Sequence, residues 1–171
     1  MAMRFDFDGK GVMVRAHRHH NPDGTTGGWV ADTAKVSDTV FVAPKAMVYG
    51  EAQVFGRAMV LDQSRVYGNT MVYGEAQISG NARVFEWAYV YGKAKIADEA
   101  QVYGQTSIHD EALVCHQAQV CGSSRITDYG IVCGESRVDG VTYVYGNTVV
   151  GDGKLLPRAV MAVLDIDNTI G

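Results

Sequence analysis

The sequence predicts an all-β protein in which short parallel strands coil into a single-stranded β-helix. From Gly27 to Asp152 the chain divides into 21 hexads without one inserted or deleted residue. The fourth place of every hexad, from Val30 to Val150, is Val or Ile. A helix would need apolar residues at a period of 3.6, and an antiparallel sheet would need reversals of the chain. Strands that turn in the same direction every six residues instead form stacked coils, which bury the Val and Ile column.

Residues 1–26 precede the repeat and predict an N-terminal cap. Apolar and polar residues alternate on both sides of the segment 8–11, which contains two glycines, and this pattern is typical of a β-hairpin. A loop from His17 to Thr26 is expected to lead into the first coil. The hairpin would cover the exposed edge that a β-helix leaves at its end.

Two further places of the hexad predict how residues 27–152 turn. The second place is small, most often Ala, because neighbouring walls converge there and a larger side chain would overpack. The sixth place is Gly or Asp in every hexad except those ending in Pro44, Glu86 and His116. Gly and Asp tolerate the positive φ that such a turn requires.

Residues 153–171 predict a C-terminal segment that caps the coils or forms an interface. The sequence Gly151–Gly153 breaks the repeat, and Pro157 precedes an apolar run from Ala159 to Ile166. We expect a short strand in this run that covers the last coil or one wall.

The composition and charge of the chain argue against several classes of function. The 171 residues have a net charge of −4 with no run of either sign, which argues against non-specific binding to duplex nucleic acid. No stretch approaches the ~20 apolar residues of a membrane span, and the N-terminus lacks an apolar signal core. The three cysteines are an odd number in no metal-knuckle spacing. These features predict a cytoplasmic protein without membrane contact.

The hexads resemble those of the left-handed β-helix hexapeptide-repeat family, whose best-known members are acyltransferases. The entry Gly27–Val30 and the repeated V-Y-G-(N/E)-A units are similar to phage- and prophage-borne hexapeptide proteins described as acetyltransferases. The resemblance covers about three quarters of the chain. It implies a left-handed coil of triangular section with three hexads per turn, and therefore about seven coils. One fold hosts many activities, so the resemblance leaves the activity open.

With 18 residues per coil, side chains 18 apart lie above one another on three outer walls. The first and second walls combine aromatic rings with arginines, which could bind a sugar, a base or a nucleotide. Stacked aromatic residues also stabilise neighbouring strands, so a purely structural role is the alternative. The candidate ligand-binding residues are Arg65, Arg83, Tyr67, Phe85, Tyr89, Tyr91, Arg125 and Trp87.

The third wall is mainly apolar and predicts an interface. We expect it to be buried in a homo-oligomer, a trimer by the family resemblance, or to be covered by the segment after Gly153. Its large apolar side chains are those of Phe41, Met59, Leu61, Leu113, Ile131 and Val149.

Two histidines inside the coils are candidate catalytic residues. The resemblance implies an acyltransferase with a His general base and acetyl-CoA as the acyl donor. His109, next to Asp110, and His116, at a corner, could act in proton transfer. The unbroken hexads and the non-helical tail depart from the family's usual donor site. His17, His19 and His20 match no zinc framework, so we expect a solvated polar loop there and no metal site.

The sequence therefore predicts a non-catalytic, oligomeric β-helical module of phage origin, which acts as a scaffold or binds a small molecule, nucleotide or sugar. The walls described above or clefts between subunits would hold that ligand. The alternative is a CoA-dependent acetyltransferase that uses His109 or His116.

Overall fold

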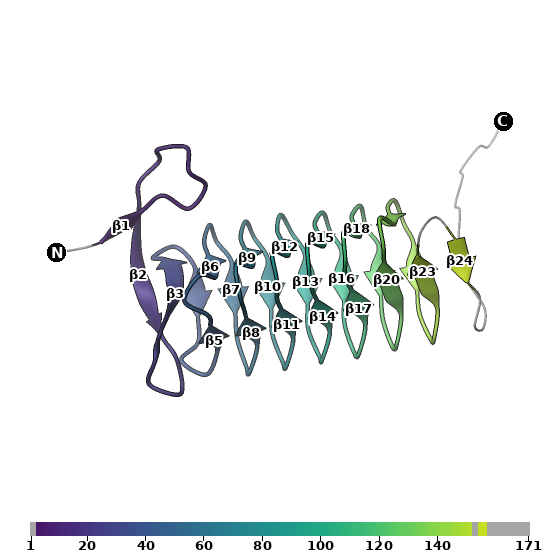
Figure 1. Ribbon diagram of the computed structural model, residues 1–171, viewed down its shortest axis with the longest axis horizontal. Helices are drawn as coiled ribbons and strands as arrows, with labels where there is room; N and C mark the ends of the chain where they lie inside the picture. The colour runs from purple at the N-terminus through teal and green to yellow at the C-terminus, as the bar shows by residue number, and fades with distance from the viewer. Residues whose placement is uncertain (1–2, 152–153, 157–171) are drawn as a thin grey trace.

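The computed structural model describes residues 3–151 and 154–156, which form a left-handed parallel β-solenoid of about seven coils (Figure 1). The predicted all-β fold is confirmed, and no helix occurs among these residues. Three parallel sheets run along the coils and form the three walls. In the part of the chain so described, there is consequently no helix that could cross a membrane.

The first wall contains one strand from each coil: β3 (Thr26–Ala31), β6 (Met47–Val48), β9 (Arg65–Val66), β12 (Arg83–Val84), β15 (Gln101–Val102), β18 (Gln119–Val120) and β21 (Arg137–Val138). The second wall contains β4 (Lys35–Val36), β7 (Gln53–Val54), β10 (Met71–Val72), β13 (Tyr89–Val90), β16 (Ser107–Ile108), β19 (Arg125–Ile126) and β22 (Tyr143–Val144). The third wall contains β5 (Phe41–Val42), β8 (Met59–Val60), β11 (Gln77–Ile78), β14 (Lys95–Ile96), β17 (Leu113–Val114), β20 (Ile131–Cys133) and β23 (Val149–Gly151).

The register of these sheets places residues 18 apart beside one another. Val66 in β9 lies beside Val84 in β12, and Val84 lies beside Val102 in β15, each pair in adjacent parallel strands. All three side chains are completely buried. A β-branched residue suits this position because it fits an extended backbone and fills the narrow interior.

From the second coil onward, the residue in the sixth place of each hexad has the turn conformation expected at a corner. Every sixth-place residue from Gly50 to Gly146 has a positive φ, including the non-glycine residues at this place. The first coil differs, because its sixth-place residues Asp32, Asp38 and Pro44 do not have a positive φ. The expectation that Gly or Asp at the sixth place adopts a positive φ is therefore wrong for Asp32 and Asp38. At Pro44 the ring holds φ negative.

Glycine is required at Gly28 by close packing and not by its φ. A Cβ atom there would lie 2.1 Å from the carbonyl oxygen of Ala46 and 2.6 Å from that of Ala43. At Gly130, the other glycine in the second place of a hexad, the nearest atoms would lie 3.0 Å away, so the backbone approaches more closely at Gly28.

The N-terminus forms the expected hairpin from β1 (Arg4–Phe5) and β2 (Val14–His20), which are antiparallel. The predicted loop over residues 17–26 is too long, because β2 continues to His20 and pairs antiparallel with β3, which begins at Thr26; only residues 21–25 connect the two strands. The open edge of the first coil needs hydrogen-bond partners, and this longer strand supplies them. Asn21 adds to the cap, since its Oδ1 accepts the N–H of Val42 at 2.9 Å.

The loop of this hairpin folds onto the first wall. The ring of Phe7 stacks on Tyr49, with centroids 4.9 Å apart, and is 5% exposed. Phe7 occupies the position above Tyr49 where the first coil has only the small Ala31. Phe5 stacks in the same way on Trp29, at 4.6 Å. The cap is therefore joined to the coils by aromatic packing as well as by strand pairing.

The C-terminal end carries the antiparallel strand β24 (Lys154–Leu156), which pairs with β23 (Figure 1). It extends the sheet of the third wall by one strand beyond the last coil. The predicted strand in the run 159–166 lies outside the described residues.

Candidate ligand-binding wall

A polar groove lies on the first wall and contains two of the predicted binding residues. Arg65 in β9 and Arg83 in β12 are direct neighbours in the register, and Gln101 in β15 continues the row. These side chains and three corner residues enclose a groove of about 380 Å³; the corner residues are Gln63, Asn81 and Glu99. Two cations, three amides and one carboxylate thus face a common space.

The two arginines stand next to each other without a local counter-charge in contact. Within residues 3–151, neither Arg65 nor Arg83 forms an ion pair with a carboxylate. Like charges in adjacent strands repel one another. An anion bound between the two guanidinium groups would relieve this repulsion, and the planar guanidinium is suited to carboxylate and phosphate.

The aromatic residues of the first wall form a continuous stack beside this groove. Tyr49, Tyr67, Phe85 and Tyr103 follow one another with ring centroids 4.8, 5.0 and 4.9 Å apart. The faces of Tyr67 and Phe85 are covered by neighbouring rings, so only their edges remain for a ligand. Burial is the main cause that raises the pKa values of Tyr49 and Tyr67.

The remaining predicted binding residues lie on other parts of the surface. In the second wall, Tyr91 is stacked between Tyr73 and His109. Arg125 lies over the ring of Tyr143 at 5.6 Å, which is a cation–π contact. Tyr89 and Trp87 are exposed, with 40% and 55% of their surface accessible. The groove therefore brings together Arg65 and Arg83 but none of these other residues.

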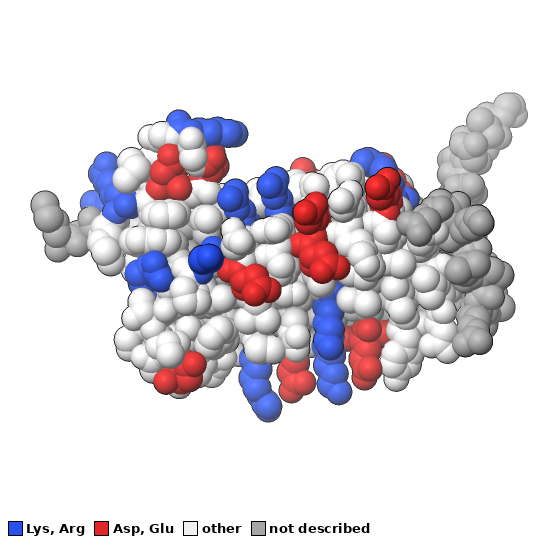
Figure 2. Space-filling view, in the orientation of Figure 1, with Lys and Arg blue, Asp and Glu red and all other residues white. Residues whose placement is uncertain are grey.

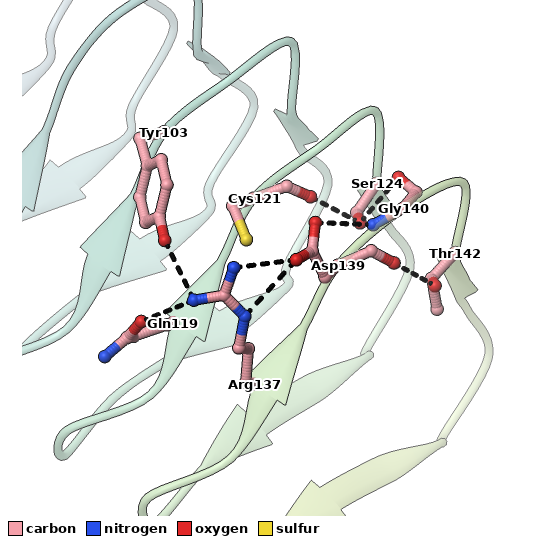
Figure 3. Close-up of polar contacts among 8 residues, drawn as sticks. All are labelled: Tyr103, Gln119, Cys121, Ser124, Arg137, Asp139, Gly140 and Thr142. Atoms are coloured by element: carbon pink, nitrogen blue, oxygen red, sulfur yellow. Dashed lines mark hydrogen bonds and ion pairs between the residues drawn. The ribbon is translucent and has the colours of Figure 1, made fainter.

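A second polar network lies on the first wall beyond the groove (Figure 3). Arg137 Nη2 donates to Asp139 Oδ2 at 2.7 Å, and its Nη1 donates to Tyr103 Oη and Gln119 Oε1, both at 3.2 Å. The pKa of Asp139 is lowered to about 2, chiefly by the hydrogen bond from Arg137 and next by that from the backbone N–H of Gly140, and the bond with Asp139 raises the pKa of Arg137. Because this cation is already paired, it is less available to a ligand than Arg65 or Arg83.

The candidate base His109 is part of a hydrogen-bonded cluster on the second wall. Its Nδ1 lies 2.9 Å from Asp110 Oδ2 and 3.1 Å from Thr127 Oγ1. Thr127 also donates to Asp110 at 2.6 Å, and this bond is the main cause that lowers the pKa of Asp110. A carboxylate on one ring nitrogen orients an imidazole for proton transfer at the other.

The other candidate base, His116, lies at a corner in a different cluster. Its Nδ1 is 3.4 Å from the Sγ of Cys115, and its backbone N–H donates to Asp98 Oδ2 at 2.9 Å. Cys115 is buried, and burial is the main cause that raises the pKa of its thiol. The sequence showed that His116 is unusual at the sixth place, but Asp98 could be connected to it only through the 18-residue register.

The N-terminal histidines do not form the expected solvated loop. His19 is 4% exposed, and its Nε2 donates to the carbonyl oxygen of Val40 at 2.9 Å. His17 Nδ1 lies 3.0 Å from Asp32 Oδ1, while His20 is exposed at the end of β2. Regular alternation would place His17 and His19 on the same face of β2. The register of β2 against β3 shifts between Arg18 and His20, and this irregularity accompanies the different exposure of the two side chains.

The third wall carries two apolar areas, which are separated by a polar row. Phe41, Met59 and Leu61 lie towards the N-terminal end, and Leu113, Ile131 and Val149 lie towards the C-terminal end; all six are partly exposed. Gln77 and Lys95 form the row between them. On the face of the molecule that Figure 2 shows, acidic and basic side chains are interspersed along the coils.

The chain was compared with known protein families, with characterised proteins and with solved structures, and none of them matched it.

Proposed function

We propose that this protein is a non-catalytic β-helical module that binds an anionic, hydroxyl-rich small molecule in the groove of the first wall. The observation that carries the proposal is the pair Arg65 and Arg83, which occupy neighbouring strands and have no carboxylate partner among the described residues. A sugar phosphate, an acidic sugar or a nucleotide has the required chemistry.

The lining of the groove supports this class of ligand. The two guanidinium groups would hold a phosphate or carboxylate by charge-assisted hydrogen bonds. Gln63, Asn81 and Gln101 provide both donors and acceptors for hydroxyl groups, and Glu99 accepts from them. The covered faces of Tyr67 and Phe85 argue against a base stacked between them.

Calorimetric titration with sugar phosphates, uronic acids, nucleotides and acetyl-CoA tests this proposal. We expect saturable binding of an anionic sugar or nucleotide, and the double variant R65Q/R83Q should weaken it at least about ten-fold, because each charged hydrogen bond contributes about 1.5–3 kcal/mol. The control R57Q/K93Q removes two cations that pair with Glu75 and Glu111 elsewhere. Equal affinity in both double variants, or no binding of any anionic ligand, would refute the proposal.

We also propose that the module is a homo-oligomer, with a trimer favoured, whose contacts are made by the third wall. Support comes from the partly exposed apolar side chains that flank Gln77 and Lys95. Apolar area of this kind is stabilised when a second copy covers it. The occupant would be another copy of the same chain.

A CoA-dependent acetyltransferase is the second candidate function. The observation that favours it is the contact between His109 Nδ1 and Asp110, which would hold the imidazole ready as a general base. Acetyl-CoA would be the donor. Acetyl transfer that is lost in H109Q would favour this function, whereas turnover that survives the loss of both His109 and His116 would contradict the assignment.

The unbroken six-residue period and the stacked coils support membership of the hexapeptide-repeat family, and the V-Y-G units support a phage origin. The three cysteines are free thiols, which supports a reducing compartment such as the cytoplasm.

A further inference from the structure

Three potential metal ligands meet at one corner of the coils. They are a carboxylate oxygen of Asp98, the Sγ of Cys115 and a ring nitrogen of His116, and all three atoms lie within 4.8 Å of one another. This cluster lies outside the residues that line the groove. No other group of three or more such residues occurs in the part of the chain that the structure describes.

The repeat explains why these residues are together. Asp98 and His116 both occupy the sixth place of a hexad, 18 residues apart, so they follow one another at the same corner. Both have a positive φ, of 60° and 59°. Cys115 occupies the fifth place beside His116, and only 8% of its surface is exposed.

The imidazole is not needed for the turn itself. Gly occupies this place in the next coil, at Gly134, with a φ of 69°. A non-glycine residue at positive φ is strained relative to Gly, although His tolerates it better than most residues. Asp98 has a structural role through Oδ2, which accepts the N–H of His116 at 2.9 Å, while its Oδ1 accepts no hydrogen bond from the residues that the structure describes.

We propose that Asp98, Cys115 and His116 bind a divalent zinc ion. Zinc prefers thiolate, imidazole and carboxylate ligands in a tetrahedral arrangement, and its usual bond lengths separate sulfur and nitrogen by about 3.5 Å. The distance between Cys115 Sγ and His116 Nδ1 is 3.4 Å. A hydrogen bond between thiol and imidazole gives the same distance, so the carboxylate of Asp98 at the same point is what favours the metal.

Three protein ligands leave the fourth position of the zinc open. Water or a small anion would fill it, as in sites where zinc has only three protein ligands. Cys133 follows Cys115 one coil later but does not belong to the cluster. As the sulfur binds zinc, the thiol of Cys115 loses its proton to the solvent and the Zn–S bond forms.

Titration of the full chain with zinc after removal of metal by a chelator tests the site, and cobalt(II) serves as a spectroscopic probe. We expect stoichiometric zinc binding and, with cobalt, a thiolate-to-metal absorption band. H116G is the decisive variant because it removes the imidazole and installs the residue found at most other corners. C115S and D98N remove the other two ligands.

The three variants should bind zinc at least about 100-fold more weakly than the wild type, since even neighbours of metal ligands cost 10–100-fold. C121S and H17Q are matched controls outside the cluster and should retain both the affinity and the cobalt band. Circular dichroism must show that H116G remains folded. No stoichiometric zinc binding, or the same affinity in H116G and C115S as in the controls, would overturn the proposal.

Discussion

Aspartate at the sixth place of a hexad combines a turn conformation with a hydrogen bond to the next coil. Asp62 Oδ2 accepts the N–H of Gly80 at 2.8 Å, and Asp128 Oδ2 accepts the N–H of Gly146 at 2.9 Å. Both aspartates have a positive φ. Asp98 and His116 share this geometry, so the proposed zinc site modifies a contact that the repeat already contains. The sequence predicted the turn, but the bond to the next coil depends on the 18-residue register.

The second place of the hexad offers a prediction about buried hydroxyl groups. Thr106 Oγ1 is buried and has no hydrogen-bond partner among the described residues, whereas Thr70 Oγ1 donates to the carbonyl oxygen of Tyr67 at 2.7 Å. Thr106→Val replaces the unpaired hydroxyl by a methyl group of similar size. We expect it to raise the free energy of unfolding by about 1 kcal/mol, because an unsatisfied buried polar group is costly. The measurement is urea or thermal unfolding.

Thr70→Val is the matched control for this change. It removes a hydroxyl that is bonded, so the free energy of unfolding should fall by about 1 kcal/mol. Effects of the same sign and size at both positions would show that the bonding of the hydroxyl is not the cause.

The pair Arg137 and Asp139 gives a prediction about pH. Asp139 has a pKa of about 2 in the folded chain, below its ordinary value of 3.8. A carboxylate with a lowered pKa adds stability that is present above the ordinary value and is lost as the pH falls towards the folded value. NMR titration should give a pKa of about 2 for the Asp139 carboxyl and a clearly higher one in R137Q. An unchanged value in R137Q would exclude Arg137 as the main cause.

At the scale of elements, the coils and the presence of an N-terminal hairpin follow from the sequence, but the length of β2 and the contacts of the cap do not. Each hexad carries its own β-branched, small and turn residues, so the strands of the three walls could be placed before the structure was known. The cap depends on contacts between distant segments, such as Phe7 on Tyr49 and His19 at Val40. No local pattern encodes these contacts, which is why β2 was expected to end before His17.

The position of Phe7 predicts how the cap is held. Phe7→Ala should destabilise the N-terminal hairpin by about 3 kcal/mol, because it removes a buried ring and exposes that of Tyr49. Amide hydrogen exchange should rise in β1 and β2 while the later coils stay protected, since each repeat contacts only its neighbours. Val12→Ala, at a residue 62% exposed, is the control and should change little. Faster exchange throughout the coils would contradict this local effect.

The candidate groove was predictable only in part, because the repeat fixes which strand residues stack but not how side chains at the corners are directed. The repeat placed Arg65 above Arg83, and so the row of cations on the first wall. The corner residues of the groove occupy the first place of their hexads, and they are Gln63, Asn81 and Glu99. The residue type at this place differs from hexad to hexad, because the side chain does not pack in the core. Their contribution to the groove depended on the direction of side chains at a corner, which the sequence pattern does not specify.

At the scale of the whole molecule, stacked coils give one buried column and three different outer surfaces. The first wall has the aromatic stack and the groove, the second has the cluster around His109, and the third has the two apolar areas. Only the inward-facing positions of each hexad form the core, so the residues at the outward-facing positions can differ from wall to wall. We therefore expect ligand binding and self-association to depend on separate residues.

The apolar third wall predicts the behaviour of the chain in solution. Ile131→Glu puts a charge in the proposed interface, which should reduce the mass measured by sedimentation from that of a trimer to that of a monomer. Val141→Glu changes an exposed apolar residue outside this wall and should leave the trimer intact. A wild-type monomer in sedimentation would contradict the proposed interface.

The stacking of residues 18 apart underlies the groove, the zinc cluster and the interface alike. Nuclear Overhauser effects between valine methyl groups in a methyl-labelled sample test it most directly. The account predicts strong cross-peaks between Val66 and Val84 and between Val84 and Val102, which pair in adjacent strands and are fully buried. Absence of these cross-peaks in the folded protein, or methyl groups exposed to solvent, would contradict the stacking.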